Sequence, residues 1–122
     1  MRKMIIAAAL GLLLASPARA GDAAKGADLF DTYCSECHSV QANGSQRKAP
    51  TLFGVIGRKT GSAPGFDYSD ANRNAAWVWS AETLETYLVA PKQAIPGTVM
   101  KFKGIPDATE RQDVIAYLAT LH

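Results

Sequence analysis

The chain has 122 residues, with 13 basic and 11 acidic side chains and a formal net charge of +2. This length suits one domain. Three of the basic residues, Arg2, Lys3 and Arg19, lie in the first 20 positions. Without them ten basic residues face eleven acidic ones, a net charge of −1. The charge therefore gives no support to a nucleic-acid-binding role.

Residues 1–20 have the pattern of a secretory signal peptide. Arg2 and Lys3 precede an apolar run of 12 residues, Met4–Ala15, and the segment ends in Ala-Arg-Ala. A membrane anchor needs about 20 apolar residues, so this run is too short. We expect cleavage after Ala20 by the Sec export route, which leaves one domain at residues 21–122 in the periplasm of a bacterium.

Three segments of the remaining chain have helical periodicity. The first, at about 23–34, has Asp22 as a candidate N-cap. The second follows Ser80, carries the apolar stripe Leu84, Tyr87 and Leu88, and is expected to stop at Pro91. The third follows Asp107, which has the spacing of a capping box with Glu110. A short helix after Ser69 is also expected, and the pattern predicts an all-α fold.

Long stretches between these helices are rich in glycine, proline and small polar residues, roughly at 39–68 and 91–106. No convincing strand alternation is found in them. Loops of this length are unusual in so small a domain. They become understandable if they wrap a large apolar object that serves as part of the core.

The stretch "YCSECHSV" contains both cysteines of the chain, Cys34 and Cys37, followed directly by His38. A thioredoxin-like redox pair needs a βαβ setting, and a structural zinc site needs a fourth ligand. A plain disulfide leaves His38 without a role. In an exported chain, Cys-x-x-Cys-His indicates covalent attachment of a c-type haem, with His38 as the proximal iron ligand.

The residues alone do not decide which ligand, if any, takes the sixth coordination position of the iron. Once the signal peptide is removed, Met100 is the only methionine, and the turn "IPG" precedes it. Lys92, Lys101, Lys103 and His122 are alternatives, as is an open position of the kind found in gas sensors and peroxidases. A thioether ligand raises the reduction potential relative to a second imidazole.

At this point the sequence closely resembles the class I c-type cytochromes, in particular mitochondrial cytochrome c and the bacterial cytochromes c2. The similarity runs from about Gly26 to Leu121. It rests on "CSECHSV", "APTLFGVIGRKTG", "FDYSDAN", "WSAETLETYLVAPKQAIPGTVMKFKGI" and "DVIAYL". The resemblance implies three main helices, short helices and long loops wrapped around one covalently bound haem.

The resemblance also implies a role for individual residues. Cys34 and Cys37 correspond to the thioether cysteines, and His38 and Met100 to the axial ligands of the iron. The carbonyl of Pro50 corresponds to the acceptor for the ring N–H of that histidine. Further haem-site positions are Arg58, Tyr68, Asn72, Trp79, Tyr87, Thr98 and Phe102. The contact between the first and last helices corresponds to Gly26, Phe30, Val114 and Tyr117.

The chain departs from the mitochondrial proteins where these place lysines around the exposed haem edge. It has Asp28, Tyr33, Gln93, Val99, Pro106 and Asp107 at those positions, and keeps Lys25, Arg47 and Lys92. We therefore expect weaker electrostatic steering of redox partners and less salt-sensitive association rates.

The expected function is that of a monomeric monohaem electron carrier, not an enzyme, in a respiratory or photosynthetic chain. Its partners would be a cytochrome bc1-type complex, a terminal oxidase or a reaction centre, met by transient docking. Two alternatives are a dedicated electron acceptor of one periplasmic dehydrogenase and, less favoured, a haem peroxidase or gas sensor.

Overall fold

The computed structural model describes residues 11, 21–43 and 48–122. The predicted signal peptide, except for Gly11, lies outside the described residues, and so does Arg47. The described part contains helices and no β-strand, with one isolated antiparallel bridge between Lys59 and Val78. The helices are α1 (Ala23–Tyr33), α2 (Asp70–Ala75), α3 (Ala81–Val89), α4 (Pro91–Ala94) and α5 (Ala108–Leu118). The predicted all-α fold is confirmed, and none of these helices is long and apolar enough to cross a bilayer.

Local capping explains where the helices begin. The side chain of Asp22 accepts hydrogen bonds from the amides of Ala24 and Lys25. Ser69 accepts from Asn72, and Asp107 accepts from Glu110. These contacts satisfy amide groups that have no partner inside the helix. All three caps were predicted from the sequence.

Helix α3 has a reciprocal cap and an unexpected continuation. The Ser80 hydroxyl accepts from the amide of Thr83, and the Thr83 hydroxyl accepts from the amide of Ser80. The helix ends at Val89, close to the predicted stop. Pro91 then begins the four-residue helix α4, which was not predicted. Proline suits a first helical turn because its missing N–H needs no partner there.

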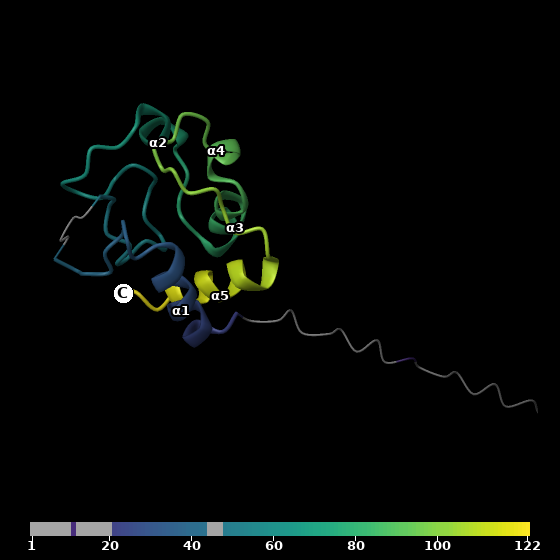
Figure 1. Ribbon diagram of the computed structural model, residues 1–122. Helices are drawn as coiled ribbons and strands as arrows, with labels where there is room; N and C mark the ends of the chain where they lie inside the picture. The colour runs from purple at the N-terminus through teal and green to yellow at the C-terminus, as the bar shows by residue number, and fades with distance from the viewer. Residues whose placement is uncertain (1–10, 12–20, 44–47) are drawn as a thin grey trace, which may run out of the picture.

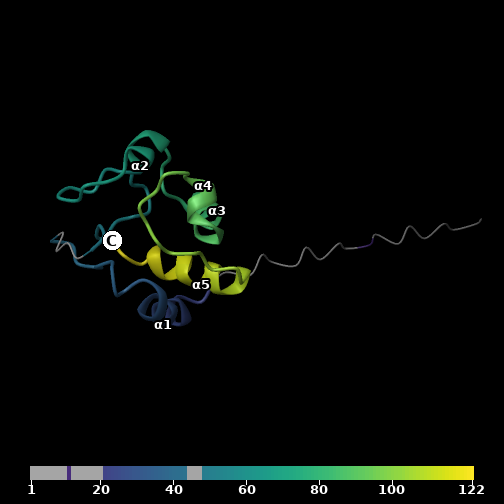
Figure 2. The ribbon, with the colours of Figure 1, turned by 45° about the horizontal axis from the view of Figure 1, so that its top comes forward.

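Helices α1 and α5 form the most extensive helix–helix contact in the described chain. They lie together on one side of the molecule, and α2, α3 and α4 lie on the other (Figures 1 and 2). A Cβ atom at Gly26 would lie 1.9 Å from the carbonyl oxygen of Asp113, so only glycine allows this approach. The ring centroids of Phe30 and Tyr117 lie 5.4 Å apart across the contact. The predicted contact between the first and last helices is confirmed.

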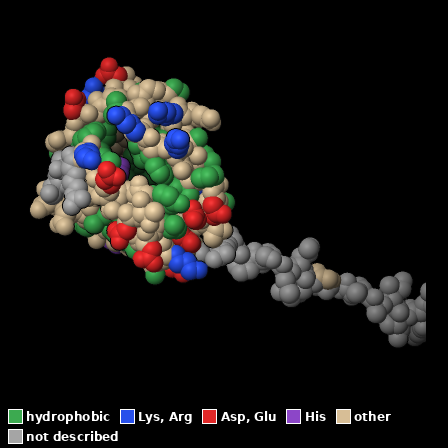
Figure 3. Space-filling view, viewed as in Figure 1, with side chains coloured by type: hydrophobic (Ala, Val, Ile, Leu, Met, Phe, Trp, Pro, Cys, Tyr) green, Lys and Arg blue, Asp and Glu red, His purple; other side chains and the backbone are tan. Residues whose placement is uncertain are grey.

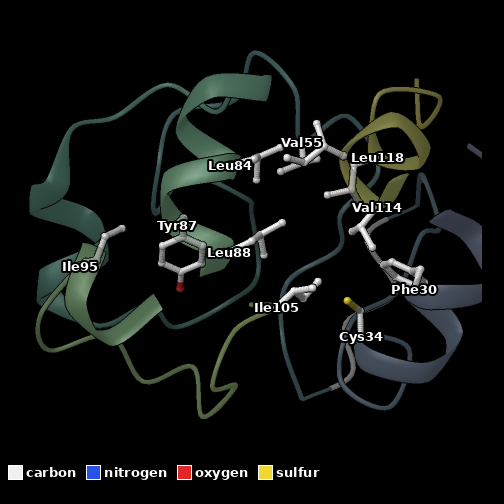
Figure 4. Close-up of a cluster of buried hydrophobic side chains, with 11 residues drawn as sticks. Phe30, Cys34, Val55, Leu84, Tyr87, Leu88, Ile95, Ile105, Val114 and Leu118 are labelled. Atoms are coloured by element: carbon white, nitrogen blue, oxygen red, sulfur yellow. The ribbon is translucent and has the colours of Figure 1, made fainter. Parts of the chain in front are cut away.

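The buried side chains form one cluster that joins both sides of the molecule. In Figure 4, Leu84 and Leu88 point from α3 toward α5, which contributes Val114 and Leu118. Long-range backbone hydrogen bonds fix the intervening loop: Gly54 donates to Leu121, 2.6 Å away. The loops between the helices therefore close around the space that α3 and α5 leave between them.

Candidate functional site

A cavity opens between α3, α5 and the loops that precede and follow α3. It holds about 840 Å³ of space free of protein atoms, including the part open to solvent. Figure 3 shows a hollow in the surface with hydrophobic side chains around it. Its walls are mainly apolar, which suits a flat apolar cofactor. The lining contains nine of the twelve predicted cofactor-site residues: Cys34, His38, Pro50, Arg58, Asn72, Trp79, Tyr87, Thr98 and Met100.

The Cys-x-x-Cys-His segment forms a turn that continues from the end of α1. The amides of Cys37 and His38 both donate to the carbonyl of Cys34, at 3.1 and 2.9 Å. Both cysteines are free thiols; Cys34 is buried and Cys37 is half-buried. Burial raises the pKa of the Cys34 thiol to about 11, and nearby Cys37 adds to the shift. Neither sulfur is engaged in a disulfide, so both are available for attachment of a cofactor.

His38 has one ring nitrogen held in place and the other left free. Its Nδ1 lies 2.8 Å from the carbonyl oxygen of Pro50. Because a carbonyl only accepts, Nδ1 carries the proton and Nε2 keeps its lone pair. Burial lowers the pKa of His38, the Pro50 bond partly opposes this, and Arg58 lowers it further. The residue is thus a neutral imidazole in the lining of the cavity, the form that binds a metal.

Met100 lies in a small polar network in the same cavity. The hydroxyl of Tyr87 donates to the Met100 sulfur at 3.3 Å and is 3.2 Å from the hydroxyl of Thr98. The Thr98 hydroxyl also accepts a hydrogen bond from the amide of Met100 at 3.3 Å. Burial raises the pKa of Tyr87, and hydrogen bonds with Thr98 and Asn72 act in the opposite direction. Tyr87 thus holds the thioether sulfur, and Thr98 holds the backbone of the same residue.

None of the alternative sixth ligands lines this cavity. Lys92, Lys101 and Lys103 are exposed, and His122 is an exposed terminal residue near the carbonyl of Ala119. Within the described residues, no three His, Cys, Asp or Glu side chains are grouped as a metal site. Met100 is therefore the one of these candidate ligands that shares a cavity with His38.

Arg58 and Trp79 supply polar and aromatic surface at the cavity. Arg58 donates to the carbonyls of Thr51, at 2.8 Å, and of Phe53. Trp79 packs against Tyr87, with ring centroids 5.0 Å apart. A buried anionic group on a cofactor needs donors of this kind, because an unpaired charge in a low dielectric is costly.

Three predicted residues do not line the cavity. The Tyr68 hydroxyl accepts from the amide of Ala63, and its ring packs edge-on against Phe66, which does line the cavity. Phe102 packs against Tyr33, with centroids 6.0 Å apart. Cys37 lies in the turn after Cys34, to whose carbonyl its amide donates, and is not among the residues that line the cavity. Roles for these residues at a cofactor stay predictions.

The structure adds lining residues that the sequence did not assign to the site. Leu52, Val55 and Phe66 come from the long loop, and Val99 precedes Met100. For Leu52 and Val55, the apolar residues of the glycine-containing segment "APTLFGVIG" were the sequence feature that could have indicated a buried role. Leu84 and Leu88, predicted as part of an apolar helical stripe, also form walls of the cavity, as do Val114 and Leu118 of α5.

Comparison with known proteins gives consistent results over nearly the whole described chain. The family model "Cytochrome c" matches residues 23–122. A cytochrome c of Theileria annulata is 52% identical over 98 residues, covering 80% of this chain and 84% of the relative. One of Gibberella zeae is 49% identical, covering 80% and 92%. One of Euglena viridis is 48% identical over 101 residues, covering 83% and 98%.

Proposed function

Since the chain belongs to the cytochrome c family and so carries electrons on one haem c bound covalently through Cys34 and Cys37, we propose that it is a soluble, monomeric carrier with His38 and Met100 as the axial iron ligands. One observation carries this proposal. A single apolar cavity is lined by an imidazole with a free Nε2 and by an oriented thioether. Ligands of this type on both sides of the iron favour transfer of single electrons over catalysis.

The chain's own residues hold the site in a fixed geometry. The Pro50 carbonyl fixes the ring of His38 and leaves Nε2 as its metal-binding atom. Tyr87 donates to the Met100 sulfur, and Thr98 bonds both the Tyr87 hydroxyl and the Met100 amide, so the thioether would stay in place as a ligand in either oxidation state of the iron. The apolar walls exclude water, which limits the reorganisation that accompanies electron transfer. When bound, the haem supplies the redox-active iron itself.

We assign Arg58 and Trp79 to the side of the cavity that meets a haem carboxylate. Both side chains line the cavity. Arg58 contributes a guanidinium with several donors, of which two contact loop carbonyls. Asn72 contributes to the network around Met100 through its bond with Tyr87.

The proposed location is the periplasm of a bacterium, reached after removal of residues 1–20. The support is the signal-peptide pattern of those residues. The relatives described above come from eukaryotes, so they bear on the family and not on this compartment. Determination of the amino terminus of the protein purified from the periplasmic fraction of its natural cell would test both parts of this assignment.

The proposed partners are membrane or periplasmic redox complexes met by transient docking, such as a bc1-type complex and a terminal oxidase or reaction centre. Val99 lines the cavity and is 60% exposed, so its surroundings are the natural contact surface. A dedicated periplasmic dehydrogenase is the alternative donor. Rates of reduction by each class of complex, measured on the same preparation, would separate these possibilities.

Optical spectroscopy with carbon monoxide tests the ligation. We expect the reduced holoprotein at neutral pH to show a six-coordinate spectrum and not to bind carbon monoxide. Ready binding by the unmodified protein would refute Met100 ligation and favour the gas-sensor or peroxidase alternative. Met100→Ala should bind it in the same assay, which serves as the positive control.

A further inference from the structure

A buried carboxylate lies at the contact between α1 and α5. Asp113, in the middle of α5, is only 4% exposed. Its Oδ1 accepts a hydrogen bond of 2.7 Å from the amide of Asp22, 91 residues away in sequence. This bond joins the start of α1 to the face of α5.

The Asp113 carboxylate has no cationic partner among the described residues. The ion pairs found there involve Lys48, Arg73 and Arg111, and none of them includes Asp113. The amide of Asp22 and the N-terminal end of α1 offer partial positive charge only. A buried carboxylate is stabilised much better by a full positive charge that also donates hydrogen bonds. The position therefore favours a cation.

Gly21 is held against the same turn of α5. A Cβ atom at Gly21 would lie 2.1 Å from the carbonyl oxygen of Gln112 and 3.0 Å from the Cβ of Ala116. The nitrogen of Gly21 is also only one residue away from the Asp22 amide that binds Asp113. Gly21 is thus held against α5 by its own backbone, and the next residue, Asp22, binds the carboxylate directly.

We propose that Asp113 is an internal binding site for a primary ammonium group, and that its occupant is the amino terminus created at Gly21 by cleavage after Ala20. In the uncleaved chain this nitrogen is a neutral amide with one N–H. Cleavage gives it a positive charge and three N–H donors. Export processing would thereby strengthen the contact of α1 with α5. The inference depends on the proposed cleavage and is independent of the electron-carrier function.

A double-mutant cycle on four holoproteins tests this. Two chains begin at Gly21 and two at Ala20, which moves the amino group by one residue; one of each pair carries Asp113→Asn. Urea unfolding gives the equilibrium constant of each. We expect the extra residue to raise the unfolding constant about tenfold with Asp113 and less than twofold in the D113N background. Equal effects in the two backgrounds would overturn the proposal, because Asp113 would then serve only the Asp22 amide.

Two further measurements keep the test decisive if D113N folds poorly. The acylation rate of the amino terminus, read by mass spectrometry of its peptide, should be several times slower in the chain beginning at Gly21 than in the one beginning at Ala20. Equal rates would count against the site. Asp28→Asn removes the same charge from an exposed position of α1. It should change neither the effect of the extra residue on the unfolding constant nor the acylation rate of the amino terminus. A natural amino terminus other than Gly21 would also refute the proposal.

Discussion

The α1–α5 pair and the loop half of the molecule bury their side chains in different ways. At the helix pair, protein packs directly on protein: Gly26 lies against the backbone of Asp113, and Phe30 packs on Tyr117. In the other half, α3 and the loops turn Leu52, Val55 and Leu84 toward a cavity. The helix pair therefore determines its own geometry, and the loop half is shaped to surround a cofactor. Stability and redox properties should accordingly respond to different substitutions.

The largest loss of stability is expected from Gly26→Ala, which would break the helix pair. The new methyl group would lie 1.9 Å from the Asp113 carbonyl oxygen, so the helices must separate. We expect a loss of about 3 kcal/mol or more in the free energy of unfolding, measured with urea. The reduction potential of the folded fraction should change little.

Gly54→Ala is a matched control for this prediction. Unlike the helical Gly26, Gly54 has a positive φ, 71°, but nothing lies within 4 Å of a Cβ placed there. It should cost only about 1 kcal/mol, the conformational penalty of the left-handed region. Equal losses for the two variants would show that the close approach of α1 and α5 does not limit stability.

Met100→Ala should affect mainly the cofactor half. The haem stays attached through Cys34 and Cys37, and the sixth position becomes open. We expect the reduction potential to fall by on the order of 0.1–0.3 V, because axial ligands tune it over about 0.8 V. Potentiometric titration with optical spectra measures this, with Val99→Ala as the neighbouring control. An unchanged potential and spectrum would exclude Met100 as the ligand.

Tyr87→Phe should give a smaller effect in the same half. It removes the hydrogen bond to the Met100 sulfur and the contact with Thr98. Loss of a donor makes the thioether electron-richer, so we expect a potential lower by on the order of tens of mV. Stability should fall by about 1 kcal/mol. Tyr117→Phe removes a hydroxyl from the α1–α5 side and should leave the potential unchanged; an equal shift in both would contradict the assigned network.

The sequence predicted the features that depend on local chemistry. Asp22, Ser69, Ser80 and Asp107 each lie where a side-chain oxygen meets free helix amides, so short stretches of sequence were enough to identify them. Helix α4 was missed because four residues give no periodic signal and Pro91 indicates both an end and a beginning.

The cavity walls contributed by the long loop could not be predicted in the same way. A helix or strand has a regular repeat that tells which side chains share a face. An irregular loop has no such repeat, so the direction of its side chains cannot be predicted from the sequence. The direction of Leu52 and Val55 instead depends on distant bonds, such as those from Leu52 to Ser39 and from Gly57 to Trp79. The resemblance predicted polar residues that the structure places in the cavity lining, and the structure was needed to show that Phe66, rather than Tyr68, lines the cavity.

The smallest expected effect concerns the contact surface at the mouth of the cavity. Val99→Lys places a positive charge beside Met100, whereas Val78→Lys adds the same charge at a 55% exposed valine that does not line the cavity. The anion hexacyanoferrate(III) is a suitable oxidant of the reduced protein. At low ionic strength, Val99→Lys should raise its bimolecular rate constant severalfold, because the local positive potential increases encounters near the haem edge.

The salt dependence of these two variants decides where electrons leave the molecule. Screening shortens the range of a single charge to about 10 Å at 0.1 M ionic strength, so the gain from Val99→Lys should fade as salt is added. Val78→Lys has the same net charge and should stay close to the unmodified protein at every ionic strength. If the two lysines accelerated the reaction equally, net charge alone would explain the effect. The proposal that electrons leave the molecule beside Val99 would then be wrong, and the mouth of the cavity would have no special role in electron transfer.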